Sequence, residues 1–255
     1  MNNHSKIGSD LQGYLNMLVE IAREAGASIR PGIDQEIITD LRRDIKIKAD
    51  VRLNKIIIDR LKKESPYPVL SEEGGFFENK SGDNEFHWIV DPLDGSLNFS
   101  RTIPLCCISI ALWKEMDPLV GVVYDFNRDE MFVGLVGTGA WLNDKPMKVG
   151  KVAEKKNAIL CTGFPVNTDF SENALLSFVK KIQSYKKVRL FGSAALSLAY
   201  VASGRADFYW ENDISMWDVA AGVAIVKAAG GIVQFSATQT EKQFVVKAGN
   251  KFLTC

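Results

Sequence analysis

Hydrophobic residues recur every three or four positions over residues 10–27 and again over residues 49–63. This spacing places them on one face of an α-helix, so the sequence predicts an amphipathic helix in each stretch. The first helix is expected to end before Pro31 and Gly32, which disfavour helical backbone. Residues 33–48 mix charged and aliphatic positions without a clear period. We interpret them as a loop that folds over a site.

Apolar and β-branched residues then alternate over short segments that are separated by turns, as is typical of strands. The strands predicted in this part of the chain are residues 69–70, 87–90, 108–113, 119–124 and 130–136. Short polar turns join the last three of them, and this arrangement is typical of hairpins. The first half of the chain is therefore predicted to contain an antiparallel sheet.

The pattern changes near residues 151–156, after which predicted strands and helices alternate. The strands are residues 158–162, 188–191, 206–210, 232–235 and 244–247, and the helices are residues 171–185, 195–202 and 219–229. Such alternation predicts an α/β arrangement. The chain is thus predicted to be an α/β protein, with an α+β subdomain over residues 1–150 and an α/β subdomain over residues 151–255.

Composition narrows the class of protein. The 255 residues are 46% hydrophobic, and Lys+Arg and Asp+Glu number 31 each, which gives a net charge of +0. This balance argues against a protein that binds nucleic acid through bulk charge. No apolar run is long enough to cross a membrane, and the N-terminus lacks the apolar core of a signal peptide. The cysteines have no C-x-x-C spacing, so we expect reduced thiols in a cytoplasmic protein rather than a zinc site. They are Cys106, Cys107, Cys161 and Cys255.

The clearest chemical signal follows the strand at residues 87–90. This strand runs into Asp91, where Pro92 is expected to stop it, and Asp94 follows three residues after Asp91. Two close carboxylates are unfavourable unless a cation lies between them, and their oxygens suit Mg²⁺, Mn²⁺ or Ca²⁺. The backbone N–H groups after Asp94 can meet a phosphate. The segment predicts metal-assisted phosphoryl chemistry; the alternative is an Asp-Pro turn with solvated carboxylates.

Other acidic residues occur in similar surroundings. Glu73 lies after a strand in a pair of acids that is followed by glycines, and Asp218 opens a helix after a loop. Together with Asp91 and Asp94 they predict a carboxylate site for two or three divalent ions, because ligands gather at strand ends and helix starts. Asp50 lies in the first turn of a predicted helix, where the helix dipole also favours an anion. Taken alone, Asp218 has the plainer interpretation of an N-cap.

Four motifs resemble signatures of the inositol monophosphatase family, which belongs to the Mg²⁺-dependent, lithium-sensitive phosphatases. They are Ser-Glu-Glu-Gly at residues 71–74, Trp-Ile-Val-Asp-Pro-Leu-Asp-Gly-Ser at 88–96, Gly-Ser-Ala-Ala at 192–195 and Trp-Asp-Val-Ala-Ala-Gly at 217–222. The resemblance extends from about residue 10 to residue 253. It implies a layered αβαβα sandwich, usually a homodimer, and a phosphoric monoester hydrolase. It also implies two or three Mg²⁺ ions, with Mn²⁺ as an alternative and Li⁺ as an inhibitor.

The resemblance also assigns roles to individual residues. The implied metal ligands are Glu73, Asp91, Asp94, Asp218 and the carbonyl of Leu93. The implied catalytic residues, which position the attacking water, are Asp50, Glu73 and Ser96. The implied substrate-binding residues are Gly95, Ser96, Ser193, Ala194 and Glu211. For Glu211 the second interpretation is a solvated acid at the end of a strand.

The chain also departs from the family's usual pattern. Ile47 stands where a threonine is usual, Asn54 where a glutamate is frequent, and Ser96 where a threonine is commoner. The lysine often found on the preceding loop has no clear counterpart. These differences affect the predicted third metal ion and the loop that precedes Asp50. They affect the predicted site for the first two metal ions less.

The residues after the central motif indicate the type of substrate. Leu97-Asn98-Phe99 resembles the monophosphatase branch, which favours a small polyol or sugar monophosphate such as inositol 1-phosphate. A 3′(2′),5′-bisphosphate nucleotidase, a fructose-1,6-bisphosphatase and a histidinol-phosphatase remain alternatives, because a shared fold does not fix the substrate. A function of another class is also open: some bacterial members of the family are binding partners in ribosomal RNA transcription.

Overall fold

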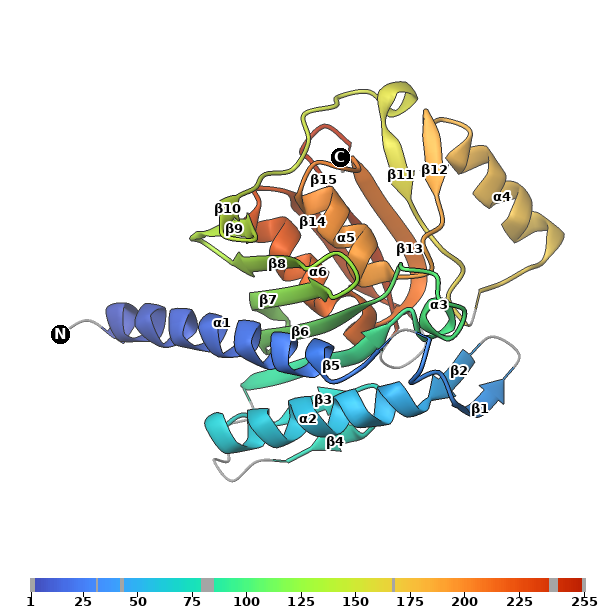
Figure 1. The fold of residues 1–255 in the computed structure, drawn as a ribbon. Helices are drawn as coiled ribbons and strands as arrows, with labels where there is room; N and C mark the ends of the chain where they lie inside the picture. Colours follow the sequence, from blue (N-terminus) through green and yellow to red (C-terminus); the bar gives the residue numbers. More distant parts are fainter. Residues whose placement is uncertain are drawn as a thin grey trace.

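The computed structural model describes residues 3–30, 32–41, 44–78, 85–166, 168–238 and 243–253; of residues 3–9, 41 and 44 only the backbone is described. Two β-sheets and the helices around them are stacked in five layers (Figure 1). Within the described part of the chain, no helix has the length and apolar character that crossing a membrane requires.

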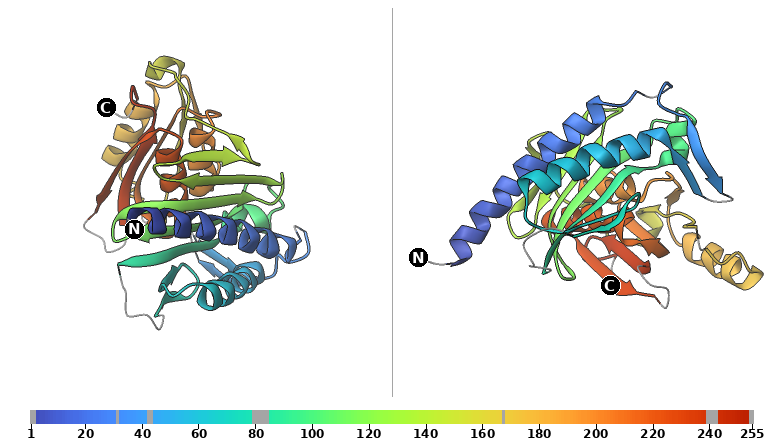
Figure 2. Two further views of the ribbon diagram at one scale, coloured as in Figure 1. Left: turned by 90° about the vertical axis from the view of Figure 1, so that its left-hand side faces the viewer. Right: turned by 90° about the horizontal axis from the view of Figure 1, so that it is seen from below.

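An outer layer of two helices covers the first sheet. Helix α1 (Asn3–Ala27) and helix α2 (Lys48–Glu64) lie side by side along this face (Figure 2). Their apolar stripes are buried as the periodicity predicts: Leu18 and Ile21 of α1, and Leu53 and Ile57 of α2, are fully buried. Burial of these stripes against the sheet holds both helices in place, since most of the stability of a helix in a protein comes from the packing of its apolar face.

The first sheet has eight strands in the order β10-β9-β8-β7-β6-β5-β3-β4. Their bounds are β3 (Val69–Ser71), β4 (Gly75–Phe77), β5 (Phe86–Asp94), β6 (Cys107–Lys114), β7 (Asp117–Asp125), β8 (Glu130–Leu135), β9 (Gly139–Leu142) and β10 (Lys145–Pro146). Neighbouring strands are antiparallel except β3 and β5, which run in parallel. The antiparallel hairpins predicted for this half are present. Because β3 and β5 are parallel neighbours, their carboxyl ends lie side by side.

The second sheet has five strands in the order β12-β11-β13-β15-β14. Their bounds are β11 (Ile159–Cys161), β12 (Lys187–Arg189), β13 (Phe208–Ser215), β14 (Ile232–Ala237) and β15 (Gln243–Gly249). Helix α4 (Glu172–Ile182) packs on its outer face, where Phe178 and Ile182 meet Leu160 and Trp210. A short 3₁₀ helix, η1 (Lys155–Asn157), precedes β11. Strand β11 is parallel to β12 and β13, so the ends of β11 and β13 also point the same way.

Helices α5 (Ala194–Ala202) and α6 (Met216–Ala228) form the central layer between the two sheets. Both are apolar on nearly every side, as expected of a helix that is buried all round. The Trp113 indole of β6 donates to the carbonyl of Ala220 in α6 over 3.2 Å, which ties this layer to the first sheet. The described core is continuous through this layer, and the division at residue 150 stays a prediction.

Three segments differ from the prediction. Residues 33–48, interpreted as a loop, contain a two-stranded hairpin of β1 (Ile37–Leu41) and β2 (Asp44–Ile47), and β4 was not expected. Strand β5 does not stop at Pro92 but continues to Asp94. The pairing of β5 with β6 is irregular between Asp91 and Asp94, so Pro92 lies where the ladder is interrupted and needs no N–H.

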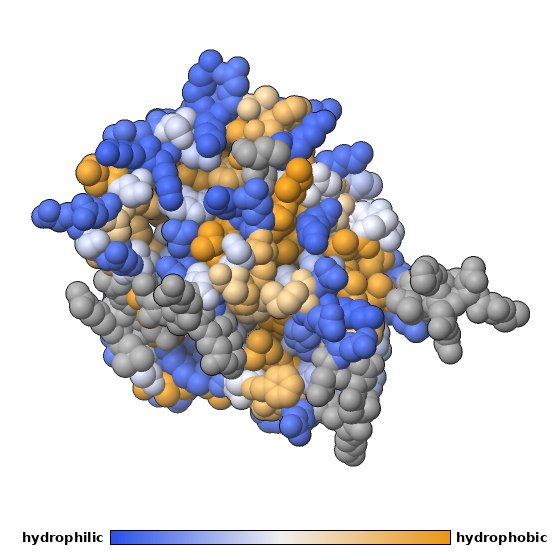
Figure 3. Space-filling model, turned by 180° about the vertical axis from the view of Figure 1, so that it is seen from behind, coloured by the Kyte–Doolittle hydropathy of each residue, from blue (hydrophilic) through white to orange (hydrophobic). Residues whose placement is uncertain are grey.

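On the back face of the molecule, hydrophilic side chains alternate with apolar areas (Figure 3).

The short helix α3 (Ser96–Ser100) lies at the end of β5, beside the hairpin of β1 and β2. The elements that carry the predicted site therefore meet where β3 and β5 end.

Candidate active site

A group of carboxylates lies where β3, β5 and α6 meet. One carboxylate oxygen from each of Glu72, Asp91 and Asp218 lies within 4.8 Å of the others. Glu72 directly follows β3, Asp91 lies in β5, and Asp218 lies in the first turn of α6. Because β3 and β5 are parallel, the Glu72 amide donates to the carbonyl of Val90 over 3.2 Å, which brings Glu72 beside Asp91. We refer to Glu72, Asp91, Asp94 and Asp218 as the carboxylate cluster.

Glu73, the residue predicted from the sequence, is not part of this group. Its carboxylate forms an ion pair with Lys46 of β2. The pairing of Ser71 with Val90 places residue 72 level with Asp91, and the next side chain projects in a different direction. The two glutamates are adjacent in sequence, so only the strand register distinguishes them.

Asp94 is held by the start of helix α5. Its Oδ2 accepts hydrogen bonds from the Ser193 hydroxyl at 2.6 Å and from the Ala195 amide at 2.7 Å. The Ser193 hydroxyl also accepts from the Leu196 amide and thereby caps α5. Ser193 is buried and contacts Asp94, and its neighbour Ala194 is buried beside it. Helix α5 of the central layer thus holds Asp94, which belongs to the first sheet.

Gly95, Ser96 and Asp50 form a second arrangement next to the cluster. Gly95 has φ +92° and precedes α3, and a Cβ on it would lie 2.8 Å from the carbonyl oxygen of Leu105. The Ser96 hydroxyl lies 2.8 Å from Oδ1 of Asp50 and 2.9 Å from the carbonyl oxygen of Leu93. Oδ2 of Asp50 accepts from the Ile47 amide at 2.7 Å. The buried carboxylate of Asp50 is therefore within hydrogen-bond distance of the Ser96 hydroxyl.

Burial and mutual repulsion raise the pKa values of these acids. Desolvation raises the pKa of Asp91 and Asp218 well above the usual range, and the charge of Glu72 raises both further. Desolvation also raises the pKa of Asp94 to about 6, against the lowering effect of its bonds to Ser193 and Ala195. Part of Glu72 is exposed, but its carboxyl group is surrounded by protein, and this desolvation raises its pKa too.

The carboxylate cluster fits a divalent cation. Among the residues that the structure describes, no lysine or arginine forms an ion pair with any of its four acids. Uncompensated carboxylates in a buried site are unfavourable, and a bound cation removes this cost. Hard oxygen donors are the ligands that Mg²⁺ and Mn²⁺ prefer.

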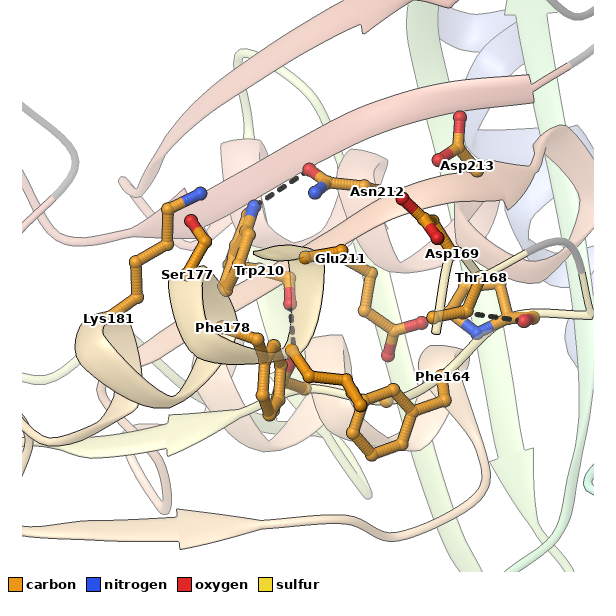
Figure 4. A pocket seen from close by; sticks show the side chains of 15 residues that line it. Phe164, Thr168, Asp169, Ser177, Phe178, Lys181, Trp210, Glu211, Asn212 and Asp213 are labelled. Carbon is orange, nitrogen blue, oxygen red and sulfur yellow. Dashed lines mark hydrogen bonds between the residues drawn. The ribbon is translucent and has the colours of Figure 1, made fainter. Parts of the chain in front are cut away.

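Glu211 of β13 lines a pocket near Asp94. This pocket, which we call the β13 pocket, has a volume of about 300 Å³ and is lined by the segment after β11, by α4 and by β13 (Figure 4). Its lining includes Phe164, Phe178, Lys181, Trp210, Glu211 and Asp213. Desolvation raises the pKa of Glu211 to about 8, and the charge of Asp94 contributes. The Tyr209 hydroxyl approaches Glu211 and lowers its pKa, but it is not within hydrogen-bond geometry.

Comparison with known proteins agrees with this geometry. The sequence pattern of the inositol monophosphatase family matches residues 10–252. The chain belongs to this family. An inositol-1-monophosphatase from Synechocystis is 40% identical over 230 residues, which cover 88% of this chain and 79% of that protein. The protein named Nus factor SuhB from Xylella fastidiosa is 38% identical over 225 residues, which cover 86% and 80%.

Solved structures of the inositol monophosphatase family have the same fold. The inositol monophosphatase from Anabaena superposes with a TM-score of 0.83 at 34% identity, over 96% of this chain and 93% of that one. The extragenic suppressor protein suhB from Bartonella henselae superposes with a TM-score of 0.85 at 33% identity, over 95% of both chains. The resemblance seen in the sequence, the α/β fold class and the assignment to the phosphoric monoester hydrolases are thereby confirmed.

The stability of the metal-free protein is expected to fall as the pH rises. Asp50 and Asp94 have folded-state pKa values of about 7 and about 6, above the unfolded value near 3.9. Between these values the unfolded chain releases protons first, so each step up in pH from about 4 to 7 favours unfolding. Mg²⁺ should therefore raise the melting temperature more at pH 7.5 than at pH 5, which scanning fluorimetry with and without a chelator measures.

A matched variant tests the origin of this pH dependence. Asp91→Asn removes one charge from the cluster and should flatten the decline of the metal-free melting temperature between pH 5 and 7.5. Asp117→Asn removes an exposed charge at the start of β7 and should leave the decline unchanged. An identical decline in all three proteins would show that the cluster does not cause it.

Gly95→Ala is expected to destabilise the protein and the turn that carries the site. Alanine at φ +92° costs about 1–3 kcal/mol, and its Cβ would also meet the carbonyl of Leu105. Gly137→Ala is the control, because Gly137 has φ +84° but open space around its Cβ position. Urea unfolding should show a larger loss for Gly95→Ala, and equal losses would exclude the close contact with Leu105 as a cause.

Proposed function

We propose that this protein is a Mg²⁺-dependent phosphomonoesterase that hydrolyses a small polyol or sugar monophosphate such as inositol 1-phosphate. The observation that carries the proposal is the convergence of the carboxylate cluster with the hydrogen-bonded pair of Asp50 and Ser96. Relatives named inositol-1-monophosphatase support the choice of substrate. Acids with no cationic partner in the described part of the chain, next to a hydroxyl held by a carboxylate, suit hydrolysis of a phosphate ester by water.

The metal ligands in this proposal are Glu72, Asp91, Asp94, Asp218 and the carbonyl of Leu93. Glu72 takes the place that the sequence had given to Glu73, because Glu72 lies in the cluster and Glu73 pairs with Lys46. Two or three Mg²⁺ ions, with Mn²⁺ as the alternative, neutralise the phosphate ester and lower the pKa of water when bound.

The residues beside the cluster position the reactants. Asp50 orients the Ser96 hydroxyl, and this hydroxyl in turn orients the attacking water. Desolvation raises the pKa of Asp50 to about 7, against the lowering effect of its bonds to Ile47 and Ser96, and this value suits a group that accepts a proton near neutral pH. The backbone N–H groups of Gly95 and Ser96 face the phosphate at the start of α3. No covalent intermediate with the enzyme is needed.

The alcohol part of the ester lies on the side of the second sheet. Ser193 and Ala194 border the phosphate, and Ser193 also holds Asp94 in place. Glu211, which lines the β13 pocket, binds a hydroxyl of the substrate. We also propose that the protein forms a homodimer, that it is cytoplasmic and that Li⁺ inhibits it. These three points rest only on the resemblance to the family.

Phosphate release with Mg²⁺ tests the proposal. The panel comprises inositol 1-phosphate, glycerol 2-phosphate, fructose 1,6-bisphosphate, histidinol phosphate and 3′-phosphoadenosine 5′-phosphate. Rapid turnover of inositol 1-phosphate is expected. If only fructose 1,6-bisphosphate, histidinol phosphate or 3′-phosphoadenosine 5′-phosphate is hydrolysed, that ester is the substrate instead. Glu72→Gln should abolish turnover, whereas Glu73→Gln should reduce it less; the opposite order would return the metal-ligand role to Glu73.

A second function has its own support in the relatives named Nus factor SuhB. A binding role in transcription would not require the acids of the cluster to carry charge. The Asp91→Asn protein therefore distinguishes the two functions: it should lose catalysis and retain any such binding. A folded wild-type protein that binds Mg²⁺ and hydrolyses no ester would favour the binding role.

A further inference from the structure

A second pocket lies on the outer face of the second sheet, beside the last turn of α4. Its volume is about 360 Å³, which is within the range of roughly 300–1,000 Å³ that small-molecule sites occupy. Trp210 of β13 pairs with Lys247 of β15, so their side chains are neighbours on this face. We call this the lysine pocket, and its described lining is Lys155, Lys181, Ser184, Tyr185, Phe208, Trp210, Gln234, Lys247 and Leu253.

The lysine pocket carries positive charge that no acid of its described lining offsets. This lining includes three lysines and neither aspartate nor glutamate. In the described part of the chain, no ion pair joins Lys155, Lys181 or Lys247 to an acid. The Lys181 ammonium instead lies 4.3 Å from the centroid of the Trp210 ring. An anion with more than one negative charge is therefore the ligand that complements this pocket.

Aromatic rings supply a second means of binding. The rings of Tyr185 and Phe208 are stacked, with centroids 5.9 Å apart and planes inclined by 10°. Trp210 adds a third ring to the lining. Burial raises the pKa of the Tyr185 hydroxyl to about 12, so this hydroxyl stays protonated and can donate a hydrogen bond. Aromatic side chains next to lysines are the combination on which nucleotides bind, because the base stacks on a ring while the phosphate meets the positive charge.

The three lysines come from separate parts of the chain that the fold brings together. Lys155 belongs to η1, Lys181 to the last turn of α4, and Lys247 to β15. The Lys186 amide donates to the carbonyls of Lys155 and Ala158 over 3.2 and 3.0 Å, which ties η1 to the turn after α4. The positive charge of the pocket is thus a product of tertiary structure and not of one basic segment exposed to solvent.

We propose that the lysine pocket binds a nucleoside monophosphate. The phosphate group, which carries about two negative charges near neutral pH, is held by the three lysines, and the base lies against the rings of Tyr185 and Trp210. A carboxylate would match less of the positive charge, and a sugar phosphate would leave the rings without a partner. None of the four acids of the carboxylate cluster lines this pocket. The site needs no divalent metal ion and does not depend on the proposed function.

Calorimetry with EDTA present tests the site in the absence of divalent metal ions. The ligands are AMP, adenosine, which lacks the phosphate, and ribose 5-phosphate, which lacks the base. AMP is expected to bind about tenfold more tightly than either of the other two, because it alone meets both the lysines and the rings. Affinity for ribose 5-phosphate equal to that for AMP would overturn the role of the rings, and equal affinity for adenosine would overturn that of the lysines. No binding of AMP at millimolar concentration would overturn the site.

Lys247→Gln locates the bound nucleotide. Lys181 and Trp210 line both the lysine pocket and the β13 pocket, whereas Lys247 lines only the lysine pocket. Lys247 is exposed, so the fold should persist in this variant, and its affinity for AMP should fall severalfold. Lys180→Gln removes an exposed lysine of α4 that lines neither pocket and should bind AMP as the wild type does. Unchanged affinity in Lys247→Gln, or an equal loss in both variants, would overturn the proposal.

Tyr185→Leu tests the contact with the base. Leucine keeps an apolar side chain against Phe208 but removes the ring, so the affinity for AMP should fall while that for ribose 5-phosphate stays the same. Urea unfolding of the variant shows whether the fold is retained. An equal loss of affinity for both ligands in a folded variant would exclude stacking of the base on Tyr185.

Discussion

Asp91→Asn is expected to remove more than about 99% of Mg²⁺-dependent phosphate release. Asp91 is 1% exposed and lies in the carboxylate cluster, within 4.8 Å of the ligand atoms of Glu72 and Asp218. Changes to groups that merely orient a metal ligand cost roughly 10–100-fold, and loss of a direct carboxylate ligand costs more. The measurement is kcat/KM with inositol 1-phosphate over a range of Mg²⁺ concentrations.

The fold of this variant should survive, because asparagine has nearly the same shape and one repulsive charge is gone. The hydrogen bond from the Leu93 amide to Oδ1 of Asp91, 3.0 Å long, can be kept by the asparagine carbonyl. The metal-free melting temperature at pH 7.5 should therefore stay the same or rise, while its increase with Mg²⁺ shrinks. Activity near that of the wild type would remove Asp91 from the site, and a lower metal-free melting temperature would contradict the repulsion.

Helices with one buried face were predictable because their period is long and regular. In α2 the stripe of Leu53, Ile57 and Leu61 is fully buried as expected. The β1–β2 hairpin was not predictable in this way: Ile37 and Ile38 are both about half exposed, so its hydrophobic residues do not mark a core face. The strand that passes through Pro92 was missed because the interrupted pairing with β6 is a property of two strands together.

Asp91, Asp94 and Asp218 of the carboxylate cluster were predictable from their positions at a strand end and a helix start. Asp91 and Asp94 belong to one strand, and their spacing was enough to predict a cation site. The choice between Glu72 and Glu73 depended on the register of β3 against β5, which no local pattern encodes. The ion pair of Glu73 with Lys46 also joins segments that are far apart in the sequence.

The β13 pocket was missed for a related reason, although one signal was present. Its rings and acids come from the segment after β11, from α4 and from β13, and no single segment shows them together. The run Glu211-Asn212-Asp213 places three polar residues in succession within an apolar strand, which a regular half-buried strand does not accommodate. Such a run indicates an irregular strand, and irregular strands are frequent next to active sites.

Asp50→Asn is expected to lower kcat by about 10²–10⁴-fold while leaving Mg²⁺ binding intact, since this is the range for loss of a proton-transfer group. Asp50 is 2% exposed and lies next to the cluster but outside the group of converging ligand atoms. An asparagine oxygen can still accept a hydrogen bond from Ser96 or from the Ile47 amide, so the start of α2 should be retained.

Ser96 distinguishes this role of Asp50 from a purely structural one. Ser96→Thr keeps the hydroxyl that Asp50 orients and should retain most of the activity, whereas Ser96→Ala should lose kcat in the same direction as Asp50→Asn. Because both variants act on one hydrogen-bonded pair, the double variant Asp50→Asn/Ser96→Ala should be little worse than Asp50→Asn alone. Independent, multiplicative losses would mean that Asp50 and Ser96 do not act together on the attacking water, and an unchanged kcat in Asp50→Asn would exclude Asp50 from the proton transfer.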